Sequence, residues 1–125
     1  MNFDSSQPIY KQIIDGYKKQ LIRGELQRGD KIPSQREYAE KVRVNPNTVQ
    51  RAYREMENMH MVETQRGQGT FVVASEEMQK EIKDEMAQKL LDYFIREMES
   101  LGYERAQIIS KLVDAYNKDQ KEEDQ

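Results

Sequence analysis

The chain has 125 residues, of which 34% are charged and 36% hydrophobic, and its formal net charge at pH 7 is -3. It has no cysteine and one histidine, which excludes disulfides and thiolate metal sites and argues against a zinc site. No apolar run is long enough to span a bilayer and no secretory leader is visible, so we expect a cytoplasmic protein without metal or cofactor. The charge is uneven, because residues 1–74 carry a net charge of +3 and residues 75–125 carry -6. The first part is therefore the better candidate for binding a polyanion.

The first predicted element is an amphipathic helix. Apolar side chains recur at helical spacing from Tyr10 to Leu21. Pro8 suits the first turn of a helix, and Gly24 suits the left-handed position after the last turn. We expect a helix from about Pro8 to Arg23, followed by a compact turn region over residues 24–30.

Two helix-start signals follow closely. Ser34 and Glu37 have the spacing of a capping box, and Asn45 is a favourable N-cap with Pro46 at the first helical position. The second of these helices has two stripes at helical spacing. Its apolar stripe consists of Val49, Ala52, Tyr53 and Met56, and its polar stripe consists of Asn47, Gln50, Arg51 and Arg54. Two short helices separated by three or four residues indicate a helix-turn-helix.

A hairpin is predicted next. The strand-like segments 61–65 and 70–73 flank Arg66-Gly67-Gln68-Gly69, whose glycines supply the positive φ of a tight turn. A thin tip with a basic side chain suits the minor groove of DNA, where the potential is strongly negative. The alternative is a solvated turn without a binding role.

The C-terminal part is predicted to form two helices. The first covers residues 76–101 and ends at Gly102, the second covers about residues 106–116, and Lys118–Gln125 is expected to be frayed. One apolar stripe on the first of these helices is a candidate dimerisation face, formed by Met78, Ile82, Met86, Leu90, Phe94 and Met98. Two helices of this size cannot bury both apolar faces by themselves. The stripe could be covered by a second chain, by the N-terminal part of the same chain, or by an apolar effector bound among the methionines.

The expected fold is all-α with a small β-wing: an N-terminal winged helix-turn-helix domain, residues 1–74, followed by a two-helix C-terminal tail, residues 75–125. Asn, Gln and Arg are the side chains that make bidentate contacts with base edges, and a helix N-terminus attracts phosphate. The polar stripe therefore predicts binding of double-stranded DNA. A solvated helix face, or a winged helix that binds protein and not DNA, is the alternative. No catalytic constellation is present, so we do not expect an enzyme.

Several spaced motifs identify a family. Segments Pro8–Ile13, Gly24–Glu37, Val44–Tyr53 and Arg66–Val72 together resemble the GntR family of bacterial transcription regulators, and the short helical tail is similar to the YtrA subfamily. The resemblance implies a dimeric regulator that binds a roughly palindromic operator, most often a repressor of a small operon, in this family often transport-related. The family would also allow a small-molecule effector.

The resemblance also implies particular DNA-binding residues. They are Ser34, Arg36, Asn45, Pro46, Asn47, Thr48, Gln50, Arg66, Gly67 and, less directly, Thr70. Arg51 and Arg54 are added from helical spacing alone, and Ser34 has the alternative role of a helix cap only. His60 stands where the family usually has glycine, and a left-handed C-cap explains it because histidine is enriched in that conformation.

Overall fold

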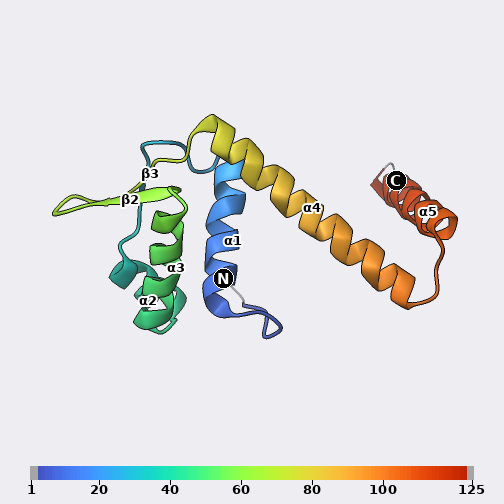
Figure 1. The fold of residues 1–125 in the computed structure, drawn as a ribbon, viewed down its shortest axis with the longest axis horizontal. Helices are drawn as coiled ribbons and strands as arrows, with labels where there is room; N and C mark the ends of the chain where they lie inside the picture. The colour runs from blue at the N-terminus through green and yellow to red at the C-terminus, as the bar shows by residue number, and fades with distance from the viewer. Residues whose placement is uncertain (1–2, 124–125) are drawn as a thin grey trace. The chain divides into compact units, whose positions relative to one another are not determined.

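The computed structural model describes residues 3–123, and side chains up to residue 121. The elements are α1 (Ile9–Ile22), β1 (Lys31–Ile32), α2 (Gln35–Val42), α3 (Pro46–Asn58), β2 (Val62–Gln65), β3 (Gly69–Val72), α4 (Glu76–Ser100) and α5 (Arg105–Glu123) (Figure 1). The expected fold class, helical with a small β-wing, is confirmed. The chain forms two compact units, and the boundary between them along the chain lies between Lys83 and Asp84, within α4. The first unit thus reaches nine residues beyond residue 74, where the sequence suggested a boundary.

The first unit is built around three helices, with α1 and α2 both packed against α3 (Figure 1). Their buried side chains are those of the predicted apolar stripes: Ile13, Ile14, Tyr17 and Leu21 from α1, and Val49, Ala52, Tyr53 and Met56 from α3. Burying a large apolar side chain contributes about 1.5–3 kcal/mol. The apolar faces of α1 and α3 therefore supply half of the buried hydrophobic residues among those described, and α2 adds Ala39.

Local capping fixes where the helices of this unit begin and end. Gly24 follows α1 with φ +79°, which lets the N–H groups of Glu25 and Leu26 donate to the carbonyl of Gln20. His60 follows α3 with φ +62°, as expected for a histidine at a left-handed C-cap. Arg43 has φ +56° and makes the turn between α2 and α3.

The sheet has three antiparallel strands in the order β1-β3-β2. The hairpin of β2 and β3 was expected, and Gly67 and Gly69 have φ values of +78° and +127° there. The short strand β1 was not expected. It pairs Lys31 with Phe71 and Ile32 with Thr70, and it turns the side chain of Ile32 into the core.

Three tyrosines from the three helices form a polar cluster inside this core. The Tyr17 and Tyr53 hydroxyls are 2.8 Å apart, and Tyr53 donates to the carbonyl of Pro33 at 2.7 Å. The Tyr38 ring lies 5.4 Å from the Tyr17 ring, measured between centroids. Burial raises the pKa of Tyr17 and Tyr38 and raises the pKa of Tyr53 to about 12. All three side chains are therefore neutral hydrogen-bonding groups at physiological pH.

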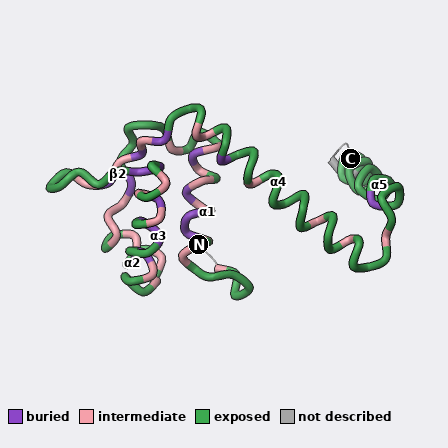
Figure 2. The backbone as a smooth tube through the Cα atoms, viewed as in Figure 1, coloured by how far each residue is buried: buried purple, intermediate pink, exposed green. Residues whose placement is uncertain are grey.

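The second unit contains the rest of α4 and α5, and most of its side chains are exposed (Figure 2). Lys111 lies over the Tyr103 ring at 5.3 Å, and Ile108 is buried. Helix α5 continues through residues 118–123, which we expected to be frayed; five of these six positions carry Lys, Glu or Gln, which favour helix. The remaining two residues of that expected tail lie outside the described residues. No described helix is both long and apolar enough to cross a membrane.

Candidate nucleic-acid interface

The start of α2 holds the first two predicted site residues. The Ser34 side-chain oxygen accepts a hydrogen bond from the Glu37 backbone N–H at 3.1 Å, so this serine caps the helix. The Arg36 side chain is 91% exposed, and its Nε lies 3.9 Å from an Oε1 of Glu40. An exposed ion pair of this kind contributes about 0–1 kcal/mol, so it leaves the Arg36 guanidinium available to a phosphate.

The start of α3 is capped by a side chain. The Asn45 Oδ1 accepts from the Asn47 backbone N–H at 2.8 Å, and Pro46 occupies the first helical position, where it has no N–H to satisfy. The Thr48 N–H donates to the Asn45 carbonyl at 3.0 Å. Asn45 thereby fixes the direction of α3, while the side chain of Asn47 remains exposed.

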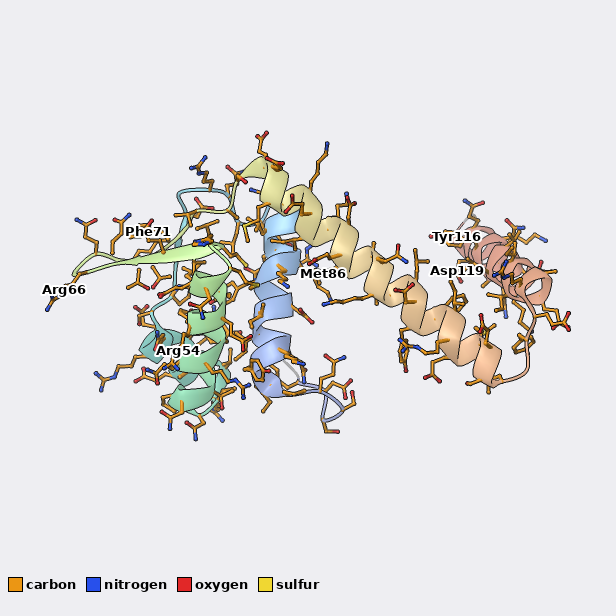
Figure 3. The ribbon with its side chains drawn as sticks, viewed as in Figure 1. Arg54, Arg66, Phe71, Met86, Tyr116 and Asp119 are labelled. Atoms are coloured by element: carbon orange, nitrogen blue, oxygen red, sulfur yellow. The ribbon has the colours of Figure 1, made fainter. Side chains whose placement is uncertain are left out.

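The predicted polar stripe of α3 is exposed along its length. Asn47, Gln50, Arg51 and Arg54 all have exposed side chains, on the side of the helix away from the buried stripe. Figure 3 labels Arg54 on this helix. Within residues 3–121, Arg54 makes no ion pair, whereas Arg51 contacts both Tyr10 and Glu55. The stripe thus combines two exposed amides with one arginine free of ion pairs and one that is held in place.

The wing places Arg66 at the tip of the β2–β3 hairpin, where it is exposed (Figure 3). Gly67 follows in the turn, where an added Cβ would meet no atom within 4 Å. The structure does not bring Thr70 to the surface with them. Thr70 is 6% exposed, and its hydroxyl lies 3.2 Å from that of Thr64, whose hydroxyl also contacts the Glu57 carboxylate.

Sequence reasoning missed one basic side chain beside the wing. Because β1 pairs with β3, Lys31 lies across from Phe71 and its side chain runs along Gly69, where an added Cβ would come within 2.5 Å of the Lys31 Cε. Lys31 is an exposed residue, so it adds a positive charge at the base of the hairpin. No local pattern pointed to it, since its place depends on pairing with a strand 40 residues away in the chain.

Other kinds of site receive little support. In the part of the chain that the structure describes, no group of three His, Asp or Glu side chains could hold a metal ion. Two open surface depressions lie beside the end of α1 and the start of α4, and charged and polar side chains make up much of their lining. No methionine lines either of them, so neither resembles the methionine-lined effector pocket that the sequence allowed.

Three helices with a β-hairpin wing, and an exposed row of amide and guanidinium groups on the third helix, define the winged helix-turn-helix class of DNA-binding domain. Residues 9–72 match the family described as "Bacterial regulatory proteins, gntR family". The chain belongs to this family, whose members are DNA-binding transcriptional regulators.

Relatives along most of the chain support the same conclusion. The chain is 47% identical to "Uncharacterized HTH-type transcriptional regulator YhcF" of Bacillus subtilis, with 88% of this chain and 91% of that protein covered. It is 40% identical to "HTH-type transcriptional repressor YtrA" of the same organism, covering 70% and 72%. A solved GntR family regulator from Listeria monocytogenes is 38% identical with a TM-score of 0.80, covering 90% and 98%. These matches include the helical tail and support placement in the YtrA subfamily.

Proposed function

We propose that this protein is a homodimeric repressor that acts in the bacterial cytoplasm by binding a roughly palindromic operator in double-stranded DNA. The observation that carries the proposal is the two-sided character of α3. Its apolar stripe is buried against α1 and α2, while the amides of Asn47 and Gln50 and the guanidinium of Arg54 are exposed. These are the groups that contact adenine and guanine edges with two hydrogen bonds, and an α-helix fits the major groove.

The proposed contacts divide by element. Asn47, Gln50 and Arg54 face base edges, Arg36 contacts phosphate, and Arg66 enters the minor groove, where Gly67 permits close approach of the backbone. Ser34, Asn45, Pro46 and Thr48 shape the helix starts that offer N–H groups to phosphate, and Thr70 supports the wing from inside. Arg51 lies on the same face of α3 and is already engaged by protein groups.

The second unit supports a dimer. Among described residues, all large apolar side chains that are exposed, apart from Ile9, lie between positions 90 and 116. A second copy of the chain would cover these apolar faces symmetrically, and two-fold symmetry matches a palindromic operator.

The predicted dimerisation stripe differs in exposure along α4. Leu90 is 70% exposed, whereas Met78, Met86, Phe94 and Met98 are half-buried. Ile82 is buried in the single chain and belongs to the first unit, so we propose for it a role in the core. The exposed apolar residues of α5, above all Leu112 and Val113, extend the proposed dimer surface.

Repression follows from binding if the operator overlaps a promoter, because the bound dimer blocks access to it. The relative YtrA, 40% identical, is described as a repressor. No separate effector or catalytic domain is needed for this mode of action.

The test starts from selection of binding sites by the full-length protein from a pool of duplexes with a randomised central segment. Competition between the selected site and a scrambled duplex then measures specificity. Asn47→Ala and Gln50→Ala should each lower discrimination by about 1–3 kcal/mol, the value of one bidentate base contact. Asn58→Ala is the matched control, since it removes an exposed amide from the other end of the same helix. A wild-type protein that enriches no sequence would show that this winged helix is not a sequence-specific DNA reader.

A further inference from the structure

One arginine of the polar stripe on α3 is held against α1. The Cζ of Arg51 lies 3.8 Å from the centroid of the Tyr10 ring, and its Nη2 donates to the Tyr10 hydroxyl at 3.2 Å. Its Nε lies 3.9 Å from an Oε1 of Glu55, one turn further along α3. The guanidinium is thus stacked on one aromatic ring and flanked by a carboxylate.

These contacts connect two elements on their exposed side. Tyr10 is the second residue of α1, and Arg51 lies in the second turn of α3, above the buried contacts between the two helices. Apolar burial holds the helices together but is not directional, and inside the core the hydrogen bond between the Tyr17 and Tyr53 hydroxyls limits rotation of α3 about its own axis. The contacts of Arg51 add a second directional constraint, on the exposed side of the two helices. Stacking of a guanidinium on a ring and a hydrogen bond to the hydroxyl both require a defined geometry.

The position of Asn47 depends on that rotation. Asn47 precedes Arg51 by four residues, so the two side chains lie on the same face of the helix, one turn apart. A rotation of α3 that displaces Arg51 therefore also displaces Asn47 and its neighbour on the stripe, Gln50. Both amides must align with base edges to make two hydrogen bonds each.

We propose that Tyr10 and Arg51 form a clamp between α1 and α3 that sets the rotation of the DNA-reading helix, which makes Tyr10 a specificity-determining positioning residue that touches no base. The inference rests on the proposed reading role of α3. It assigns Arg51 a different role from that of Arg54. A bidentate contact with guanine uses two of the three guanidinium nitrogens, and in Arg51 two of the three, Nε and Nη2, already face Glu55 and Tyr10. Reading by Arg51 would therefore break at least one of these interactions, whereas Arg54 makes no ion pair among the described residues.

The experiment uses the full-length protein and the duplex that the wild type selects from a randomised pool. Affinity for this duplex and for a scrambled one is measured across salt concentrations for Tyr10→Leu, Arg51→Leu and the double variant. Each single substitution should reduce the preference for the selected duplex by about two- to fivefold, the equivalent of one exposed cation–π contact. The salt slope should not change, because neither residue contacts phosphate. The double variant should lose no more than either single variant, because both remove the same clamp.

Conservative variants provide the controls. Tyr10→Phe keeps the ring and should retain most of the preference. Arg51→Lys keeps the charge but not the planar group, so it should lose the preference as Arg51→Leu does, with the wild-type salt slope. Tyr10→Phe and Arg51→Lys test the clamp even if a leucine variant misfolds, and circular dichroism would reveal such misfolding.

Four results would overturn the clamp. A salt slope lowered by about 0.9 in Arg51→Leu would mean that this arginine itself contacts phosphate. Additive losses in the double variant, or an unchanged preference in Tyr10→Leu, would mean that the two residues do not act together on specificity. If the wild type selects no sequence at all, the proposed function fails and the clamp fails with it. If it selects a sequence that Tyr10→Leu prefers as strongly as the wild type does, only the clamp fails.

Discussion

At the scale of single residues, the direction of the hydrogen bonds in the tyrosine cluster predicts which tyrosine hydroxyl contributes more to stability. The Tyr53 proton is donated to Pro33, so the Tyr17 hydroxyl is the donor in the bond between the two tyrosines. Tyr53→Phe removes the partner of both groups and should cost about 1–3 kcal/mol of unfolding free energy. Tyr17→Phe removes one bond and leaves Tyr53 satisfied by Pro33, so it should cost about 0.5–1.5 kcal/mol. Urea unfolding of the two variants measures the difference, and a larger loss in Tyr17→Phe would reverse the donor assignment.

The same cluster predicts how stability depends on pH. A tyrosine in the unfolded chain ionises near pH 10, whereas burial raises the pKa of Tyr17 and Tyr38 and raises that of Tyr53 to about 12. A raised folded pKa means that the unfolded state loses its proton first. The contribution is therefore complete below about pH 10 and is lost as the pH rises toward 12.

The measurement is the midpoint of thermal unfolding from about pH 8 upward. It should fall steeply above about pH 10, and it should fall less steeply in Tyr53→Phe, which has one ionisable group fewer in the cluster. The comparison between wild type and variant separates the effect of the cluster from that of all other groups, which the two proteins share. Equal slopes for the two proteins would contradict the prediction.

Arg66 at the tip of the wing provides the electrostatic prediction. Because a guanidinium in the minor groove neutralises about one phosphate charge, Arg66→Ala should weaken binding to selected and scrambled duplexes together and lower the log–log salt slope by about 0.9. Arg23→Ala is the matched control, because Arg23 is exposed after the end of α1 and already paired with Glu25 at 2.8 Å. A wild-type slope in Arg66→Ala, or an equal effect of Arg23→Ala, would remove the wing from the interface.

At the scale of elements, one substitution at the C-terminal end of α3 should stabilise the protein. His60 has φ +62°, a conformation that costs a residue with a Cβ about 1–2 kcal/mol. Glycine avoids this cost, but it loses more conformational entropy on folding, which offsets part of the gain. His60→Gly should therefore stabilise the protein by about 0.5–1 kcal/mol in urea unfolding. His60→Ala retains a Cβ and should give no such gain. A glycine variant less stable than the wild type would show that the histidine side chain itself stabilises this turn.

The elements also show what could be predicted from the sequence. The caps at Ser34 and Asn45 and the stripes of α1 and α3 were predicted correctly because each depends on residues within one or two turns of the chain. Strand β1 was missed because two residues have no detectable period, and their pairing partner, Phe71, lies 40 positions later. The contact of Arg51 with Tyr10 was missed for the same reason: helical spacing gave the face of Arg51 but not its partner on α1.

At the scale of the whole molecule, burial and charge are divided between the two parts of the chain. Buried residues lie mostly in the first unit and exposed residues make up most of the second (Figure 2). The largest fully buried side chains of the described residues all come from the first unit, whereas exposed apolar side chains concentrate in the second. The tail after residue 74 also carries the net charge of -6. Its charge alone would weaken binding to DNA, so a tail that aids binding must act through something other than electrostatics. Dimerisation is the candidate, because it makes contact with the second half-site effectively intramolecular.

Substitutions on the surface of α5 test this role without truncating the chain. Leu112 and Val113 are 43% and 51% exposed in the single chain, so Leu112→Glu and Val113→Glu should leave the fold of a monomer intact. If a second copy covers these residues, each glutamate is buried in an apolar interface and the dimer dissociates. Sedimentation should then show a monomer, and affinity for the selected duplex should fall by about 10²–10⁴, the usual gain from linking two contacts.

Ser110→Glu separates dimer loss from charge. It adds the same negative charge to an exposed position on the same helix, and charges beyond about 8–10 Å are screened at physiological salt, so it should bind nearly as the wild type does. Binding to a scrambled duplex should change little in all three variants, because one winged domain suffices for it. A wild-type protein that sediments as a monomer, or a Leu112→Glu variant that remains dimeric and binds with full affinity, would contradict the proposed dimer. The apolar face of α5 would then need another partner.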